Sequence, residues 1–387
     1  MDKIKISEDR FSRLELISWW DQEKLSKAKV MVVGAGALGN EVLKNLALYG
    51  IGNICIVDFD KIEESNLTRT VLFKEKDIGR FKAEVAAERV KEIYTDTKVM
   101  WSNGDIGFDI GLGVFRRMDI IIGCIDNREA RLFLNRNAWK VNKTWIDGGI
   151  QEIMGSFAVY KPSEGACYEC TLSDKDYEIL NVRYSCPLLR REDILMGKSP
   201  TTPSISSIIA GFQVQEAIKI LHDIPVNPGV LYYINGATNL FDFIKFERKE
   251  NCQSHILYEP IFEIDETSEA LTFESLLKIG KEMIGTEKAS INLDRDILIK
   301  FICPNCGNEE EVLKPVIRVP QDKETCPYCG AKRKYEATNI INGNESWANK
   351  TLKELGFPSF HIYEINSLDK SIFIEISGDL NNSLYFK

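Results

Sequence analysis

The amino-acid sequence predicts an α/β fold, a doubly wound parallel sheet followed by a C-terminal α+β extension that carries a zinc ribbon. Three observations lead to this prediction. Buried-strand and amphipathic-helix patterns alternate along the first part of the chain, a glycine-rich turn follows the first strand, and two CxxC pairs lie close together in the last third. With 387 residues the chain can form two to three domains whose cores need no disulfides.

Composition and charge exclude several classes of protein. Hydrophobic residues make up 44% and charged residues 28%, as in globular proteins. The net charge of −9 argues against a nucleic-acid partner, which would need a basic surface. No apolar run reaches the roughly 18 residues of a membrane span, and the charged N-terminus has no apolar signal core. We therefore expect a cytoplasmic protein without a membrane partner.

Strand and helix patterns alternate in the first half of the chain. Apolar runs of strand length lie at residues 29–33, 53–58, 120–123 and 144–146, and helical periods lie at 38–47, 81–94, 127–141 and 206–221. Strands that alternate with helices form parallel sheets with right-handed crossovers. Two cysteines, Cys55 and Cys124, belong to or follow these apolar runs, where we expect buried thiols.

A glycine motif joins the first strand to its helix. Gly34, Gly36 and Gly39 have the spacing that allows a tight turn and brings a phosphate close to the positive end of a helix. Asp58 follows Gly39 by 19 residues at the next strand end, where a carboxylate can hold ribose hydroxyls. This motif alone indicates an adenine nucleotide and would by default suggest a nicotinamide dehydrogenase.

Further charged residues at strand ends suggest a triphosphate instead. The additional candidates are Asp60, Asn66, Arg69, Lys82, Asp126 and Asn127. A dinucleotide pyrophosphate needs only the helix end, whereas attack on a triphosphate requires cations to neutralise the developing charge and a carboxylate to hold Mg²⁺. Carboxyl ends of parallel strands are where open α/β sheets bind ligands.

This order of motifs resembles the ubiquitin-activating-enzyme superfamily, which includes the bacterial adenylyltransferases of sulfur carriers. The resemblance covers roughly residues 8–255. It rests on Arg10-Phe11-Ser12-Arg13, Gly34-Ala35-Gly36-Ala37-Leu38-Gly39, Asp58-Phe59-Asp60, Ser65-Asn66-Leu67-Thr68-Arg69, Lys82, Asp126-Asn127, Cys167-Tyr168-Glu169-Cys170 and Cys252-Gln253-Ser254-His255.

The resemblance implies a Rossmann-like core and a reaction between ATP and the C-terminal glycine of a small β-grasp protein. The products are an acyl-adenylate and pyrophosphate. By position, Asp58 binds ribose, Asn66, Arg69 and Lys82 hold phosphates, and Asp126 lies at the magnesium. The resemblance also implies a homodimer in which Arg13 reaches the partner subunit's site. Leu14 and Thr70 replace the glutamines usual after the two motif arginines, which affects fine positioning but not phosphate neutralisation.

Two structural zinc sites are predicted. The spacing of the C-terminal pairs, Cys303/Cys306 and Cys326/Cys329, is typical of a zinc ribbon, and four thiolates leave no open metal position. The first site, Cys167, Cys170, Cys252 and His255, is implied by the resemblance, with histidine where family members usually have cysteine. The alternative for His255 is an ordinary surface histidine.

Cys186 is the remaining cysteine and has basic neighbours that lower the pKa of a thiol. It lies between the first zinc pair and the helix at 206–221, in a segment that looks like a mobile loop. In relatives that form a thioester with their carrier protein, the catalytic cysteine lies in this segment. An inert thiol is the alternative.

The predicted domains are an adenylation domain at 1–255, with a crossover segment at about 171–205, and an α+β domain at 256–387 with its ribbon at 301–333. In the second domain we expect a helix at 273–283, a strand at 296–301, a short capped helix at 351–358, and paired strands at 360–365 and 371–376. This pattern loosely resembles the ubiquitin-fold domain that recruits a conjugating enzyme.

The leading hypothesis is ATP-dependent adenylation of a ubiquitin-like protein, followed by thioester transfer to Cys186 for conjugation. An adenylyltransferase for a sulfur carrier, with Cys186 inert, is the alternative. Two other classes fit the sequence less well. A nicotinamide oxidoreductase lacks a supporting histidine or tyrosine constellation, and a silent zinc-ribbon scaffold does not account for Arg13, Arg69, Lys82 and Asp126.

Overall fold

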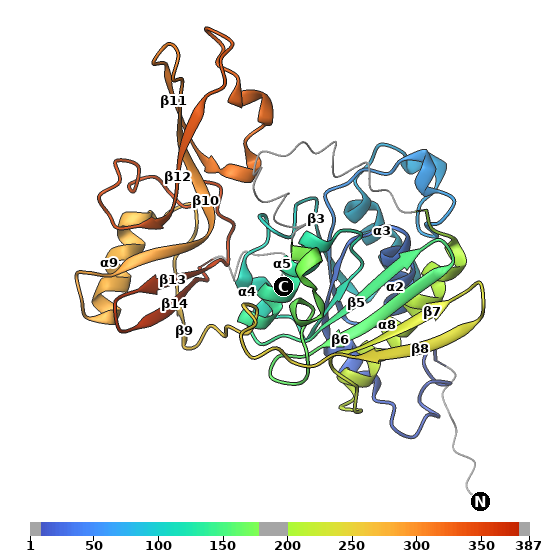
Figure 1. Ribbon diagram of the computed structural model, residues 1–387. Coiled ribbons are helices and arrows are strands. Elements are labelled where there is room, and N and C mark those ends of the chain that lie inside the picture. Colours follow the sequence, from blue (N-terminus) through green and yellow to red (C-terminus); the bar gives the residue numbers. More distant parts are fainter. Residues whose placement is uncertain (1–8, 178–199, 379–387) are drawn as a thin grey trace, which may run out of the picture. The chain divides into compact units, whose positions relative to one another are not determined.

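The computed structural model describes residues 9–177 and 200–378 of the chain (Figure 1). They divide into two compact units. The first unit comprises the described residues of 1–107, 115–171 and 199–257, and the second comprises those of 108–114, 172–198 and 258–387. The predicted domain limits, 1–255 and 256–387, stay a prediction, since the two units exchange short segments along the chain.

The first unit contains an eight-stranded sheet in the order β3-β2-β1-β4-β5-β6-β7-β8. Neighbouring strands from β3 to β5 are parallel, and those from β5 to β8 are antiparallel. The strands are β1 (Lys29–Val33), β2 (Asn53–Val57), β3 (Lys98–Ser102), β4 (Ile120–Gly123), β5 (Trp145–Gln151), β6 (Met154–Tyr160), β7 (Val230–Asn235) and β8 (Leu240–Lys245). The predicted doubly wound α/β class is confirmed.

Helices cover both faces of this sheet. Ile146 of β5 belongs to the apolar core that also contains residues of α2 and α8, while the adjacent Trp145 points to the other face and donates to Asn135 on α5. The helices are α1 (Gln22–Lys27), α2 (Ala37–Leu48), α3 (Lys82–Ile93), α4 (Leu112–Arg116), α5 (Arg128–Lys140) and α8 (Pro203–Leu221), with short 3-10 turns η1 (Glu64–Asn66), η2 (Glu75–Asp77) and η3 (Glu169–Thr171). Helix α8 begins three residues before its predicted start.

The second unit is built on a mixed sheet in the order β11-β10-β13-β14-β9, with β12 also paired to β10. Its elements are β9 (Ile261–Ile264), α9 (Phe273–Ile284), β10 (Ser290–Ile302), β11 (Glu309–Pro315), β12 (Lys334–Ile341), β13 (Ile362–Asn366), β14 (Ser371–Ile376), η4 (Val316–Arg318) and η5 (Gln321–Glu324). Thr272 caps α9 by accepting a hydrogen bond from the Ser275 amide, and Gly285 ends it in the left-handed region. The helix predicted at 273–283 is present as α9, and the paired strands predicted at 360–365 and 371–376 are present as β13 and β14. Strand β9 precedes α9 in the chain.

The predicted short helix at 351–358 is wrong. Thr351 and Glu354 do exchange capping hydrogen bonds, since the Thr351 amide donates to the Glu354 carboxylate and the Glu354 amide to the Thr351 hydroxyl. The segment nevertheless forms only turns, because Gly356 takes a φ of +83° and Pro358 follows it. A local capping signal was therefore present without a length of chain that could continue the helix.

Among the described residues, none of the helices combines the length and the apolar character needed to cross a membrane.

Candidate nucleotide site and metal centres

The three glycines between β1 and α2 have different surroundings. A Cβ atom on Gly39 would lie 2.0 Å from the Gly34 carbonyl oxygen, and one on Gly34 would lie 2.4 Å from the Cys124 carbonyl oxygen. Gly34 also has a φ of +94°, which L side chains rarely adopt. A Cβ atom on Gly36, in contrast, would meet no atom within 4 Å. The loop is therefore closely packed at its ends and open at Gly36.

Helix α2 begins at this opening. Its N-cap is Gly36, which offers no side chain to the first amides of the helix. The first N–H groups of an α-helix have no partner within the helix, and together with the helix dipole they favour an anion. The open space beside Gly36 thus fits a phosphate group.

Asp58 lies directly beside the glycine loop. Its Oδ2 accepts a hydrogen bond of 2.7 Å from the Ala35 amide, and its Oδ1 accepts one of 2.8 Å from the Asp60 amide. Burial raises the pKa of the Asp58 carboxyl, although the Lys82 cation and the Ala35 amide oppose this. The carboxylate expected at the ribose is therefore fixed in place by the backbone of the loop.

The other candidate phosphate ligands come from two segments after β2. Lys82 opens α3, and its Nζ lies 2.9 Å from Oδ2 of Asp60. Arg69 donates to the Ser65 carbonyl oxygen over 2.6 Å. The side chain of Asn66 is buried and its Oδ1 accepts from the Glu63 amide, so it also caps η1.

Asp126 and Asn127 follow β4. Asp126 is exposed, so its carboxylate can face a hydrated cation. Asn127 is the N-cap of α5, and its Oδ1 accepts a hydrogen bond of 2.8 Å from the Ala130 amide. Its side chain therefore caps α5, in addition to the nucleotide-binding role predicted from the sequence.

Sequence reasoning missed an ion pair next to this turn. Arg131 Nε lies 2.9 Å from Oδ1 of the buried Asp147, and its Nη2 donates to the carbonyl oxygens of Ile125 and Gly148. The pair holds the residue before Asp126 against β5. Asp147 is the third residue of β5 and directly follows the strand predicted at 144–146, and only its place after this apolar run could have signalled it.

Two predicted catalytic residues, Arg13 and Cys186, cannot be assigned to the site. Arg13 lies exposed in the turns at residues 10–17, and its role toward a partner subunit stays a prediction. Cys186 lies outside the described residues.

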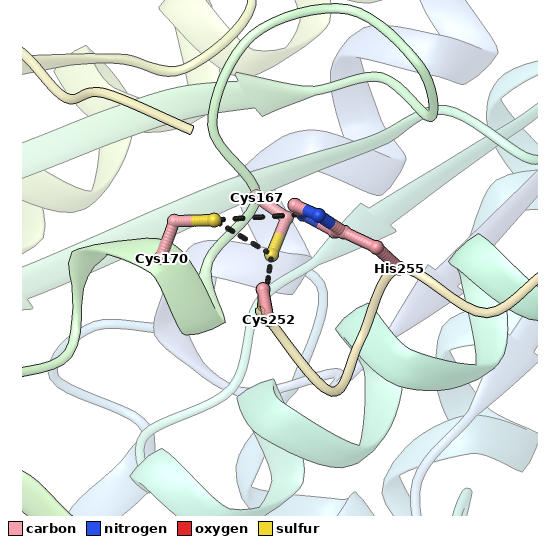
Figure 2. Close-up of side chains that lie close together, drawn as sticks. All are labelled: Cys167, Cys170, Cys252 and His255. Carbon is pink, nitrogen blue, oxygen red and sulfur yellow. Dashed lines mark hydrogen bonds between the residues drawn. The ribbon is translucent and has the colours of Figure 1, made fainter. Parts of the chain in front are cut away.

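The first predicted metal centre is assembled by distant segments of the first unit (Figure 2). The Cys167 Sγ lies 3.6 Å from those of Cys170 and Cys252, and the Cys170 Sγ lies 3.5 Å from Nε2 of His255. Sulfur ligands around a tetrahedral zinc with bonds of ~2.3 Å lie about 3.8 Å apart. Burial lowers the pKa of His255 and so favours the neutral imidazole that a metal needs. The residues fit zinc.

A polar shell holds the two halves of this centre together. Glu169, almost fully buried, accepts hydrogen bonds from Arg136 of α5 and from the Ser254 hydroxyl. The Asn135 amide donates to Ser254, while its Oδ1 accepts from the Tyr168 amide. No local sequence pattern signals this shell, because its members are brought together only by the fold.

The second metal centre lies in the second unit. The Sγ atoms of Cys303 and Cys329 are 3.5 Å apart, and those of Cys306 and Cys326 are 3.7 Å apart. All four lie within 4.8 Å of one another. The hydrogen bond from the Asn305 side chain lowers the pKa of Cys329 to about 6, which favours the thiolate form. This set fits a zinc ion held by four thiolates.

Comparison with known proteins identifies relatives of this chain. The SUMO-activating enzyme subunit 2 of Dictyostelium discoideum is 36% identical over 149 residues, covering 38% of this chain and 22% of the relative. Ubiquitin-like modifier-activating enzyme 5 of Aedes aegypti is 28% identical over 254 residues, covering 62% of this chain and 60% of the relative. The chain thus spans less than two thirds of these relatives.

Solved structures agree. The crystal structure of E. coli MccB with succinimide matches with a TM-score of 0.54 and 26% identity, covering 64% of this chain and 75% of that one. The family model described as ThiF matches residues 9–254. This range contains the glycine loop, Asp58, Lys82, Asp126 and most of the first metal centre. The chain belongs to the ThiF family.

Proposed function

We propose that this protein uses ATP to adenylate the C-terminal carboxylate of a ubiquitin-like protein. The observation that carries the proposal is the open space at Gly36, with the backbone-held Asp58 at its side and Arg69 and Lys82 on the segments that follow. Family membership supports it, as do relatives named as activating enzymes of ubiquitin-like modifiers. MccB, at 25% identity, has been solved with AMPCPP and MccA.

The residues present suit this chemistry. A carboxylate that attacks a triphosphate is repelled by it, so cations must screen both groups. Arg69, Lys82 and Asn66 would bind the phosphates, Asp58 the ribose, and Asp126 with Asp60 and Asn127 would lie toward Mg²⁺. A bound Mg²⁺ supplies charge neutralisation on the triphosphate. Because Lys82 is paired with Asp60, phosphate binding would exchange one anionic partner of Lys82 for another.

After adenylation, we propose thioester transfer to Cys186. This step rests on the sequence position of Cys186 and on its basic neighbours. A conjugating enzyme would then bind the C-terminal domain, for which a ubiquitin-fold likeness stays a prediction. Adenylation of a sulfur carrier without a thioester is the alternative.

The proposal also includes two structural zinc ions and a homodimer in which Arg13 lies in the partner subunit's site. It places the protein in the cytoplasm. The zinc assignments are supported by the ligand distances in both clusters. Each set offers four ligands and no open position, so neither zinc would take part in the reaction.

ATP–pyrophosphate exchange tests the adenylation step, with candidate β-grasp proteins ending in glycine as substrates. A non-reducing gel run alongside tests the thioester, with Cys186→Ala as the matched variant. Exchange with a thiol-sensitive band that Cys186→Ala abolishes supports the full proposal. Exchange without a band favours the sulfur-carrier alternative. Exchange only with a short peptide, as the similarity to MccB allows, would contradict a protein substrate.

A further inference from the structure

The backbone of one residue, Leu72, connects two separate parts of the first unit. Its amide donates a hydrogen bond of 2.9 Å to Oδ1 of Asn40, and its carbonyl oxygen accepts one of 3.2 Å from Nε of Arg89. Asn40 belongs to α2 and Arg89 to α3. Both side chains are buried, Asn40 completely. Leu72 is therefore held from two sides.

Asn40 also holds the glycine loop. Its Nδ2 donates hydrogen bonds of 2.7 Å to the Ala35 carbonyl oxygen and 3.0 Å to that of Gly36. These carbonyls belong to the stretch of loop that includes the open position. A side chain of this kind, buried with both its donors and its acceptor satisfied, fixes the loop in one arrangement.

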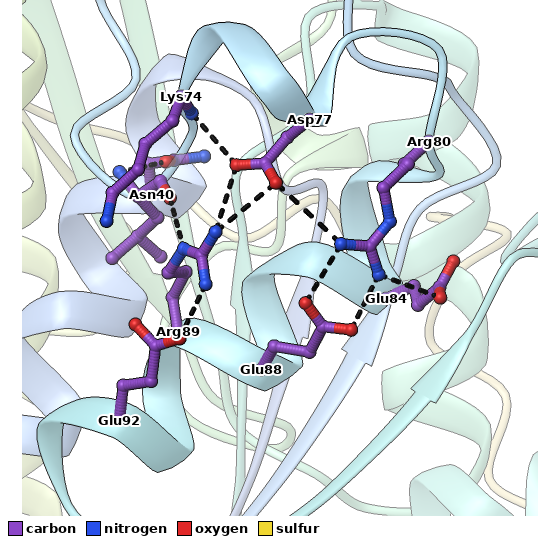
Figure 3. A network of polar contacts seen from close by, with 9 residues as sticks. Asn40, Lys74, Asp77, Arg80, Glu84, Glu88, Arg89 and Glu92 are labelled. Atoms are coloured by element: carbon purple, nitrogen blue, oxygen red, sulfur yellow. Dashed lines mark hydrogen bonds and ion pairs between the residues drawn. The ribbon is translucent and has the colours of Figure 1, made fainter.

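Arg89 extends the connection to the turn before α3 (Figure 3). Its Nη2 lies 3.2 and 3.1 Å from the two carboxylate oxygens of Asp77, whose side chain is 1% exposed. Asp77 also accepts a hydrogen bond from the Lys74 amide, and Arg80 approaches it at 3.7 Å. Arg80 in turn pairs with carboxylates on the outer side of α3.

The connected segments are those that carry the candidate phosphate ligands. Gly36 lies in the loop that Asn40 holds, Arg69 lies three residues before Leu72, and Lys82 is the first residue of the helix that holds Arg89. We propose that Asn40 and Arg89 are positioning residues that fix the spacing of these three groups for a triphosphate. This inference rests on the proposed function and deepens it, since neither residue need touch the nucleotide.

Geometry rather than charge is what this arrangement supplies. Arg89 is paired with Asp77 and Glu92, so its cation is already neutralised within the network. Replacement by lysine keeps the charge but cannot donate in the fixed directions toward both Leu72 and Asp77. Asn40→Asp keeps the shape and the acceptor for the Leu72 amide, but places an oxygen against the carbonyls of Ala35 and Gly36.

The test measures the Kd of Mg-ATP by calorimetry and the KM values for ATP and for the carrier protein by pyrophosphate exchange. For Arg89→Lys and Asn40→Asp we expect the Kd and KM for ATP to rise roughly tenfold, because small displacements of binding groups are costly. The KM for the carrier stays unchanged. A defect of folding alone would lower the active fraction without changing either constant.

Arg295→Lys is the matched control. Arg295 is also buried and also makes two hydrogen bonds to one aspartate, Asp294, but it belongs to the second unit. Its replacement should leave the ATP constants unchanged. If the Arg89 or Asn40 variants fail to fold, Asp77→Asn replaces them, since it keeps the shape of the side chain and weakens the support of Arg89 while both hydrogen bonds to Leu72 keep their donors and acceptors.

The outcomes separate this inference from the proposed function. Wild-type protein that binds no Mg-ATP overturns the proposed function. If the wild-type protein binds Mg-ATP and every folded variant has a Kd for ATP within about twofold of the wild-type value, the positioning role is overturned. An equal loss in Arg295→Lys also overturns it, since the effect would then not depend on Leu72.

Discussion

At the scale of single residues, the three glycines of the loop separate stability from binding. The close approaches at Gly34 and Gly39 are internal to the fold, so a side chain there displaces backbone atoms. At Gly36 the space is open, and its φ of −75° lies outside the left-handed region that only glycine adopts easily. Replacement by alanine should therefore lower stability at Gly34 and Gly39 but impair ligand binding at Gly36.

We predict that Gly36→Ala leaves the melting temperature nearly unchanged but weakens Mg-ATP binding by roughly tenfold or more, because the methyl group occupies the space for the phosphate. Gly39→Ala should lower the melting temperature by several degrees, since its Cβ meets the Gly34 carbonyl. Thermal unfolding and calorimetry measure the two effects. A strongly destabilised Gly36→Ala protein would contradict the distinction.

Asp77 predicts a pH dependence. Burial opposes ionisation, but hydrogen bonds from the Lys74 amide and Arg89 outweigh it, and the pKa of Asp77 is lowered. A carboxyl with a lower pKa in the folded state stabilises the fold above its unfolded pKa of about 4, and this contribution is lost as the pH falls.

Asp77→Asn should therefore cost about 3 kcal/mol of unfolding free energy at pH 7, the range for one partner removed from a buried pair. The difference from wild type should narrow as the pH falls below about 4.5, because asparagine does not titrate. Urea unfolding at several pH values measures it. A difference that widens on acidification would reverse the assigned sign.

At the scale of elements, periodicity predicted several of those that are buried on one face or throughout, although the largely buried β6 was not predicted. The strands at β1, β2 and β4 are continuous apolar runs, and α2 and α3 have one apolar face, so each was found close to its observed limits. Strand β8 was missed because all its residues are exposed and its hydrophobic order carries no simple alternation.

The start of β10 was missed for another reason. The predicted strand began at residue 296, because the charged Asp294 and Arg295 interrupt the apolar pattern before it. In the fold, Arg295 is buried against Asp294 and lies over the rings of Phe108 and Phe357. Like the links of Asn40 and Arg131, these are contacts between distant segments, and no local pattern encodes them.

Each unit contains one set of four metal ligands, so we predict that each unit binds its own zinc ion. Cys303 and Cys306 lie between β10 and β11, and Cys326 and Cys329 precede β12, so one ion would join the ends of β11 and β12, two of the three strands that pair with β10. We expect two zinc ions per chain by elemental mass spectrometry.

Cys303→Ser should reduce the count from two to one and leave the Kd for Mg-ATP unchanged, and Cys167→Ser should also reduce it to one. Each loss follows from the removal of one of four ligands. Loss of both ions from either variant would mean that the two centres are not independent. A count of zero in the wild-type protein would remove both assignments.

At the scale of the whole molecule, each of the two units is built from segments that are separated along the chain. Phe108–Val114 belongs to the second unit, although the residues on either side belong to the first. Gly113 donates to the Phe360 carbonyl oxygen over 2.7 Å, and a Cβ on Gly111 would lie 2.3 Å from the Ser359 carbonyl oxygen. The C-terminal residues therefore complete the surroundings of an early segment.

We predict that a protein truncated after residue 257 exchanges the amide hydrogens of Phe108–Val114 far faster than the full chain, because the Phe360 acceptor of the Gly113 amide and the rest of the second unit are missing. The amides of β1 and β4 should keep their protection, since their partners lie within the first unit. Hydrogen exchange with mass spectrometry resolves both. Equal protection of Phe108–Val114 in the two proteins would contradict the dependence.

The same segment sets an order of events during synthesis. When Gly111 leaves the ribosome, about 250 residues must still be translated before Ser359 and Phe360 emerge. At about 5–20 residues per second this takes roughly 12–50 seconds. The apolar side chains of Phe108 and Ile110 remain without their final neighbours for this time, which makes the nascent chain a client for chaperones well after its first sheet can form.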